Sequence, residues 1–235
     1  MKGATSTSGL QHLLRSSRVR QEFISHAFFS NVRSAPLEHS QVGTILGQWW
    51  HPLHYFPTFL ARCVAILPDI ASKCAIARIL FQETGEGDPR RAHEVIFSDT
   101  MERVGFGRNV TTEAPAFEET MALVEGYRVA TGGSHDALGV VYATEVADLV
   151  MVSAIGTAVR RVTGATDLEW VDIHELQEPD HVHEADSVML PDFDPRQRDT
   201  VVESAERLWR SWTAFFDRLE AETFARPATV VAESR

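Results

Sequence analysis

Two histidines and a glutamate stand at helical spacing near residue 180, in the pattern His174-x3-Glu178-x2-His181. Positions i, i+4 and i+7 lie on one face of a helix, so these side chains could bind a metal ion together. Pro179 lies inside the pattern and predicts either a kink or a new helix start at that point. A new start would make His183 an alternative to His181 as the ligand.

Further candidate ligands lie upstream, around a glycine-rich turn and in a long apolar segment. Glu83 ends an apolar helical stretch, and His93 follows it across the turn. Glu86 is the alternative carboxylate, but it stands between two glycines, which favours exposure to solvent, so we prefer Glu83. Glu145 lies among apolar residues, where a buried carboxylate needs a metal ion or a basic partner.

Together these positions form a candidate site for two metal ions. Imidazole suits iron and zinc, and carboxylate suits oxidised iron and manganese, so three of each fit a pair of iron ions. In helical di-iron proteins such ligands project inward from several facing helices. The alternative is an acidic, solvated helix face in a metal-free helical binding protein. The six candidate ligands are Glu83, His93, Glu145, His174, Glu178 and His181.

The elements that must position these residues all show helical periodicity. Apolar side chains recur at helical spacing, and glycines and prolines separate the segments. We expect an all-α bundle of about seven or eight helices, forming a single domain over residues 1–235 with flexible ends at about 1–8 and 227–235. Pro52 and Pro57 should kink or interrupt the second helix. The expected helices cover about 10–30, 42–67, 69–84, 89–104, 116–130, 135–162, 167–190 and 201–219.

Composition and charge exclude some classes of partner. The chain of 235 residues has a net charge of −11, which disfavours binding to nucleic acid or to an anionic membrane surface. No run of about 18 apolar residues and no signal-peptide core is present, so we expect no membrane span and a cytoplasmic location. Cys63 and Cys74 lack the spacing of a disulfide framework, which favours a reducing compartment.

The combined motifs resemble a known enzyme family. The turn Glu83-Thr-Gly-Glu-Gly-Asp-Pro-Arg-Arg-Ala-His93, then Glu145, then His174-x3-Glu178-x2-His181 are similar to the heme-oxygenase-like diiron oxidases and oxygenases. That family shares its fold with heme oxygenases, the TenA proteins and the quinone-cofactor synthase PqqC. The resemblance spans about residues 40–220 and implies a cofactor of two Fe(II) ions, with O2 as co-substrate. It also implies a division of ligands: Glu83, His93 and Glu145 on one iron, and His174, Glu178 and His181 on the other, with Glu145 or Glu83 able to bridge.

The same resemblance implies an O2-dependent oxidoreductase. Such an enzyme would desaturate, cyclise, cleave or N-oxygenate a small amino-acid-like substrate in natural-product biosynthesis, and the alternative substrate is a fatty acid. As partners we expect that small molecule and at most a second copy of the chain, as a homodimer. Candidate clamps for a substrate carboxylate are Arg78, Arg108, Arg128 and Arg160.

Two other activities of the same fold stay open. A thiaminase-like enzyme would need Cys63 or Cys74 as a nucleophile in its pocket. A heme oxygenase would need a proximal histidine, for which His12 and His26 are available. Neither activity gives a role to the cluster around His174.

Overall fold

The described part of the chain is entirely helical in its regular structure. The computed structural model describes residues 9–189 and 193–224, and the ends that we expected to be flexible, 1–8 and 227–235, lie outside these residues. Within the described ranges the chain forms eleven α-helices and one 3-10 turn. They are α1 (Gly9–Arg15), α2 (Arg18–Ile24), α3 (Ala27–Ser34), α4 (His39–Ile66), α5 (Ile70–Glu83), η1 (Pro89–Arg91), α6 (His93–Arg103), α7 (Arg108–Thr111), α8 (Glu118–Ala130), α9 (Ser134–Thr163), α10 (Glu169–Ser187) and α11 (Pro195–Phe224).

The helix count exceeds the seven or eight that we expected, mainly because the N-terminal segment is broken twice. Residues 10–30 were expected to form one helix, but they belong to α1, α2 and α3. Serine side chains bond to the preceding turn at both breaks, from Ser16 to the carbonyl of His12 and from Ser25 to that of Gln21. His26 then starts α3, where its ring accepts a hydrogen bond from Phe28 N. Such local side-chain bonds compete with helix continuation. A four-residue helix, α7, also lies between the expected helices 89–104 and 116–130.

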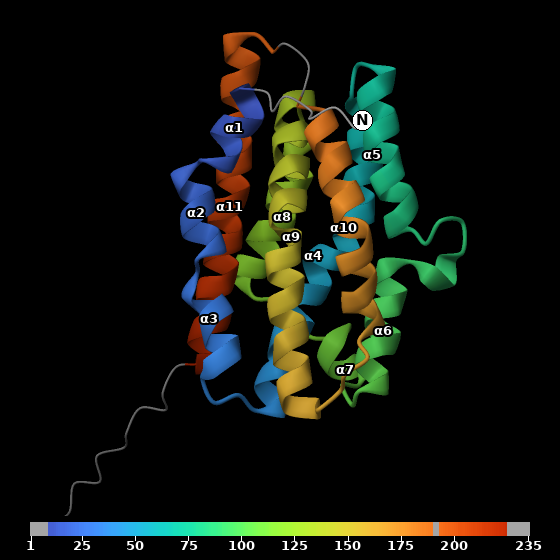
Figure 1. The fold of residues 1–235 in the computed structure, drawn as a ribbon, viewed down its shortest axis with the longest axis vertical. Helices are drawn as coiled ribbons and strands as arrows, with labels where there is room; N and C mark the ends of the chain where they lie inside the picture. Colours follow the sequence, from blue (N-terminus) through green and yellow to red (C-terminus); the bar gives the residue numbers. More distant parts are fainter. Residues whose placement is uncertain (1–8, 190–192, 225–235) are drawn as a thin grey trace, which may run out of the picture.

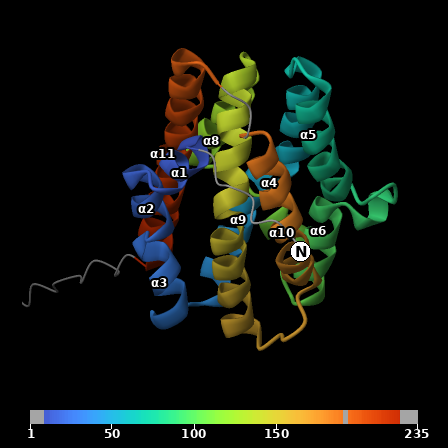
Figure 2. The ribbon, with the colours of Figure 1, turned by 45° about the horizontal axis from the view of Figure 1, so that its top comes forward.

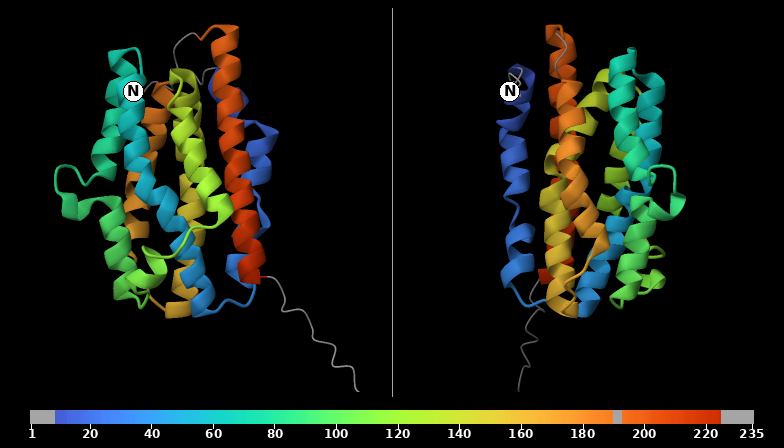
Figure 3. Two further views of the ribbon diagram at one scale, coloured as in Figure 1. Left: turned by 180° about the vertical axis from the view of Figure 1, so that it is seen from behind. Right: turned by 45° about the vertical axis from the view of Figure 1, so that its right-hand side comes forward.

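Helix α9 lies at the centre of the bundle (Figure 1), and its packing explains its apolar sequence. It contacts α11 on one side and α10 on the other, with α4 and α8 also against it. The α1–α3 segment covers α11, and α5 and α6 stand beyond α10; Figures 2 and 3 show the same order from other directions. By length and composition α9 could cross a membrane, but 72% of its most apolar window is buried in this bundle. Its apolar character therefore follows from its place in the core.

The contact between α9 and α11 is close because of a glycine and a regular seam. A Cβ added to Gly139 would lie 2.4 Å from the carbonyl oxygen of Val201, so no side chain fits at this position. On α11 the apolar side chains that recur at steps of four and three residues are all buried and form a regular seam: Val201, Ala205, Leu208, Trp212, Phe215 and Leu219.

Three prolines lie within long helices without ending them. Helix α4 continues through Pro52 and Pro57, and α10 continues through Pro179. The interruptions that we allowed for at these prolines are therefore absent. Each proline removes one backbone hydrogen bond. Apolar side chains on both sides of the α4 prolines, among them Leu53 and Phe59, are buried and hold the helix in place.

Candidate metal centre

The predicted ligand face of α10 points into the bundle. His174, Glu178 and His181 are all buried, and no break at Pro179 shifts their register. His183, the alternative ligand, is exposed. A solvated acidic face would expose the same three residues, so their burial contradicts that interpretation.

The turn between α5 and α6 places two further candidates beside this face. Glu83 is the last residue of α5 and His93 the first of α6; both are buried, and the His93 Nδ1 atom lies 3.0 Å from the Glu83 carboxylate. Gly85 makes the turn possible: its φ is +86°, and a Cβ there would lie 2.2 Å from the carbonyl oxygen of Asp88. Glu86 is exposed, with a φ of +56°.

Glu145 comes from the middle of α9, and it joins the six candidates into two adjacent groups. One group is Glu83, His93 and His174, and the other is Glu145, Glu178 and His181; within each group, atoms that can bind a metal all lie within 4.8 Å of one another. The groups touch, because His181 Nδ1 lies 3.3 Å from Glu145 and 3.9 Å from Glu83. This grouping differs from the division that the resemblance implied, since His174 and Glu145 exchange places.

Several buried polar atoms of these groups have no hydrogen-bond partner within the part of the chain that the structure describes. They are Glu145 Oε1, both carboxylate oxygens of Glu178, and His181 Nε2. Leaving buried polar atoms unpaired costs free energy, and native proteins rarely do so without a reason. A donor set of nitrogen and carboxylate oxygen atoms fits iron, so the residues present fit two iron ions.

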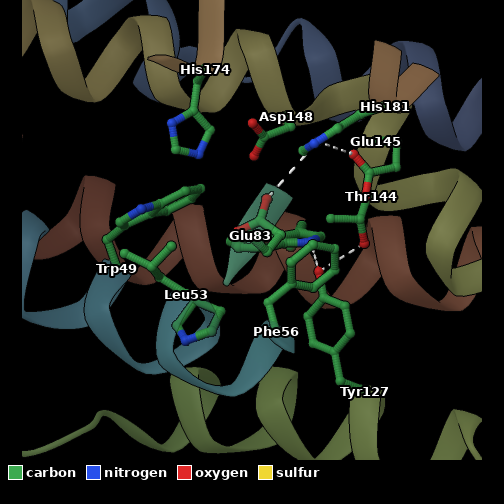
Figure 4. Close-up of a pocket in the computed structure, with 12 residues that line it drawn as sticks. Trp49, Leu53, Phe56, Glu83, Tyr127, Thr144, Glu145, Asp148, His174 and His181 are labelled. Atoms are coloured by element: carbon green, nitrogen blue, oxygen red, sulfur yellow. Dashed lines mark hydrogen bonds and ion pairs between the residues drawn. The ribbon is translucent and has the colours of Figure 1, made fainter. Parts of the chain in front are cut away.

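A small cavity lies against the two groups (Figure 4). Its volume is about 30 Å³, enough for one or two molecules of the size of water or O2. Polar groups of the metal-binding face form one side. The other side is mainly apolar and aromatic, from α4, α8 and α11: Trp49, Pro52, Leu53, Phe56, Tyr127 and Trp212.

Comparison with known proteins gives the family. The family model described as "iron-containing redox enzyme" matches residues 44–213, which cover both metal-binding groups. The chain belongs to this family. The comparison with curated proteins gives no match.

Solved structures with the same fold include other members of the heme-oxygenase-like class. A TenA homologue from Pseudomonas syringae superposes with a TM-score of 0.74 at 13% identity, over 93% of this chain and 95% of that one. A domain of unknown function with a heme oxygenase-like fold from Shewanella denitrificans gives 0.73 at 16%, over 92% and 94%. A CADD-like protein of unknown function from Nostoc punctiforme gives 0.71 at 12%, over 91% and 92%. These likenesses show the fold, and they confirm the predicted all-α, heme-oxygenase-like class.

In this member of the family, two of the histidines are oriented by hydrogen bonds on the side of the ring that faces away from the other ligands. His174 Nδ1 lies 2.7 Å from the carbonyl oxygen of Trp170, and His93 Nε2 lies 2.9 Å from Gln177 Oε1. A carbonyl or amide oxygen only accepts, so each of these ring nitrogens donates its proton there. In the neutral form of each ring, the opposite nitrogen then carries no proton and can bind metal.

Glu178 and Glu83 have strongly perturbed pKa values. Burial and the charges of Asp148, Glu145 and Glu83 raise the pKa of Glu178 to about 12. Burial also acts to raise the pKa of Glu83, but the hydrogen bond and charge of His93, with the charges of His181 and His174, lower it to about 2. Crowded carboxylates of this kind repel one another unless cations lie between them.

The pKa values of His174 and His181 shift in opposite directions. Burial, reinforced by the charge of His93, lowers the pKa of His174 to about 3. Burial also opposes charge on His181, but the neighbouring Glu145, Glu83 and Asp148 raise its pKa to about 9. Neighbouring titratable groups with pKa values driven apart are typical of functional sites.

Sequence reasoning missed two side chains at the site. Asp148 lines the cavity together with Glu145. The two stand at positions i and i+3 of α9, and this spacing was visible in the sequence. Gln177 orients His93, and only its position within the α10 motif could have suggested that role.

The residues required by the two other activities of this fold lie elsewhere. Cys63 is buried outside the cavity, where burial raises the pKa of its thiol, and Cys74 is exposed. His12 is exposed, and the ring of His26 bonds Asp217 and the start of α3. Neither cysteine and neither histidine lines the cavity.

Proposed function

We propose that this protein is a non-heme diiron oxidase or oxygenase that activates O2. The observation that supports it is the pair of buried groups, Glu83–His93–His174 and Glu145–Glu178–His181, whose polar atoms have too few partners within the chain. Membership of an iron-containing redox family agrees with it. Two iron ions bound there would bind O2 and supply the oxidising chemistry.

The chain's own residues would prepare the site for that chemistry. Trp170 and Gln177 fix the protonated nitrogens of His174 and His93, so the other nitrogens are presented to metal without a proton to lose. The aromatic wall that includes Trp49 and Trp212 excludes bulk water from the cavity. Exclusion of water strengthens the electrostatic interactions of the site and limits side reactions.

The residues that line the cavity indicate which class of substrate it could accept. The amino acid favoured by the sequence would need a basic partner for its carboxylate, and no arginine is among the described residues that line this cavity. The four candidate clamps instead form ion pairs elsewhere: Arg78 with Glu184, Arg108 with Asp99, Arg128 with Glu125, and Arg160 with Asp172. The apolar wall favours the second candidate, a fatty acid or another substrate whose reacting part is hydrocarbon. A cavity of about 30 Å³ requires lining side chains to move when such a substrate enters.

Anaerobic reconstitution tests the proposal. The purified protein is loaded with Fe(II), its iron is counted, and O2 is added while visible absorption is followed, with and without fatty acids or amino acids. We expect about two irons per chain and a transient absorption band. His181→Ala should lose iron, whereas the exposed His183→Ala, the matched control on the same helix, should keep it. A wild-type protein that binds no iron would contradict the proposal.

A further inference from the structure

Asp148 belongs to the same space as the six predicted ligands. It lies one helical turn after Glu145 on α9 and lines the cavity with Glu83, Glu145, His174 and His181. Figure 4 shows its carboxylate pointing into the space between the rings of His174 and His181, above the carboxylate of Glu83. Asp148 is thus aimed at the metal-binding atoms.

Carboxyl groups crowd this space. Glu83, Glu145, Asp148 and Glu178 can contribute four negative charges, and the residues described as lining the cavity include no lysine or arginine. The carboxylate oxygens of Glu178 and the Oε1 atom of Glu145 are buried without hydrogen-bond partners among the described residues, while Glu83 and Glu145 lie against His93 and His181. Burying carboxyl groups this close together is costly, and bound cations would offset that cost.

Three carboxylates and four carboxylates predict different net charges for the loaded site. With neutral histidines, two Fe(II) ions and three carboxylates leave one positive charge in a buried space. A fourth carboxylate cancels it. Among the described residues facing the cavity, Asp148 is the one available as that fourth carboxylate.

We propose that Asp148 is a fourth carboxylate of the metal centre, which binds at the group formed by Glu145, Glu178 and His181 and makes the site electrically neutral with two divalent ions. The assignment to this group follows from position: Asp148 lies one helical turn after Glu145 on α9, and it lines the cavity together with Glu145 and His181. This inference rests on the proposed two-metal function.

Titration with metal tests this role without any assay of the loaded enzyme. Mn(II) and, anaerobically, Fe(II) are titrated into wild type, Asp148→Asn, Asp148→Glu and the control Asp180→Asn. Asp180 is an exposed acidic residue of α10, so its variant changes the net charge by the same amount away from the cavity. We expect Asp148→Asn to weaken the second ion about 10- to 100-fold and to lower the iron retained after desalting from about two to about one per chain. Asp148→Glu should restore part of the affinity.

The outcomes separate the two proposals. Weakening of one ion in Asp148→Asn, with Asp180→Asn like wild type, supports the role of Asp148. Equal titrations of wild type, Asp148→Asn and Asp180→Asn would overturn that role and leave the two-metal function standing. A wild type that takes up neither metal would overturn both. Thermal unfolding of the metal-free Asp148→Asn protein confirms that the variant folds, because removing a buried charge should not destabilise it.

Discussion

Two groups of buried polar side chains in this bundle differ in how their atoms are satisfied. Between α4 and α8, the Gln48 amide oxygen accepts from Phe117 N at 2.9 Å and from the Thr120 hydroxyl at 2.7 Å, while its nitrogen donates to Pro115 O at 3.0 Å. In the metal-binding groups, by contrast, Glu178 has no partner for either oxygen. A polar group satisfied by the chain stabilises the fold, whereas one left unsatisfied indicates a ligand from outside.

A substitution of Glu178 tests this difference between the two groups most directly. In Glu178→Gln we expect loss of most of the stabilisation by metal, which for one ion at 100 times its Kd amounts to about 2.7 kcal/mol. The metal-free variant should be as stable as the metal-free wild type or more so, because a buried, repelled carboxylate has been removed. Thermal unfolding with and without Mn(II) measures both effects. A metal-free variant destabilised by more than about 1 kcal/mol would assign Glu178 to the structural class instead.

Gln48→Leu should behave in the opposite way. It leaves the Phe117 N–H and the Thr120 hydroxyl buried without an acceptor, so the free energy of unfolding should fall by about 3 kcal/mol. The loss should be equal in the presence and absence of metal, and metal affinity should not change. Denaturant unfolding with and without Mn(II) gives the comparison. A loss that disappears once metal is bound would show that the two regions are not independent.

Gln177 stands between the two classes, because it is bonded within the chain yet serves a candidate ligand. Gln177→Leu removes the acceptor that orients His93, and we expect a 10- to 100-fold loss of iron affinity with little change in metal-free stability. Gln177 is half-buried, so its removal leaves no large cavity. Calorimetric titration with Mn(II) measures the affinity. As a control, Leu176→Ala changes an exposed neighbour on the same helix and should leave it unchanged.

The sequence was sufficient for the parts of the fold that depend on long periodic helices. Helices α5, α8, α9 and α10 begin and end within about three residues of the predicted bounds, because burial imposes the periodicity that the sequence shows. Residues 10–30 were predicted wrongly as one helix because the side-chain hydrogen bonds of Ser16 and Ser25, and the cap of α3 by His26, divide the segment at positions that apolar spacing does not mark.

At the site, helical spacing in the sequence predicted which side chains share a helix face, but it did not predict the distances between helices. It identified the face of His174, Glu178 and His181, whose burial no local pattern could establish. The exchange of His174 and Glu145 between the two groups depends on how α10 packs against α5 and α9, which spacing does not encode. Asp148 was overlooked because an acidic residue at i+3 from Glu145 also fits a solvated helix face.

The choice between Glu83 and Glu86 gives the smallest expected effect. Glu86 is exposed and has a left-handed backbone, which glycine adopts without steric cost. Glu86→Gly should therefore change the free energy of unfolding by no more than about 1 kcal/mol, in the stabilising direction, and leave the iron content at the wild-type value. Glu83→Gln, at the buried end of α5, should lower the iron content. Iron content and thermal unfolding are measured for both variants. If Glu86→Gly lost as much iron as Glu83→Gln, the metal ligand would lie in the turn and not at the end of α5.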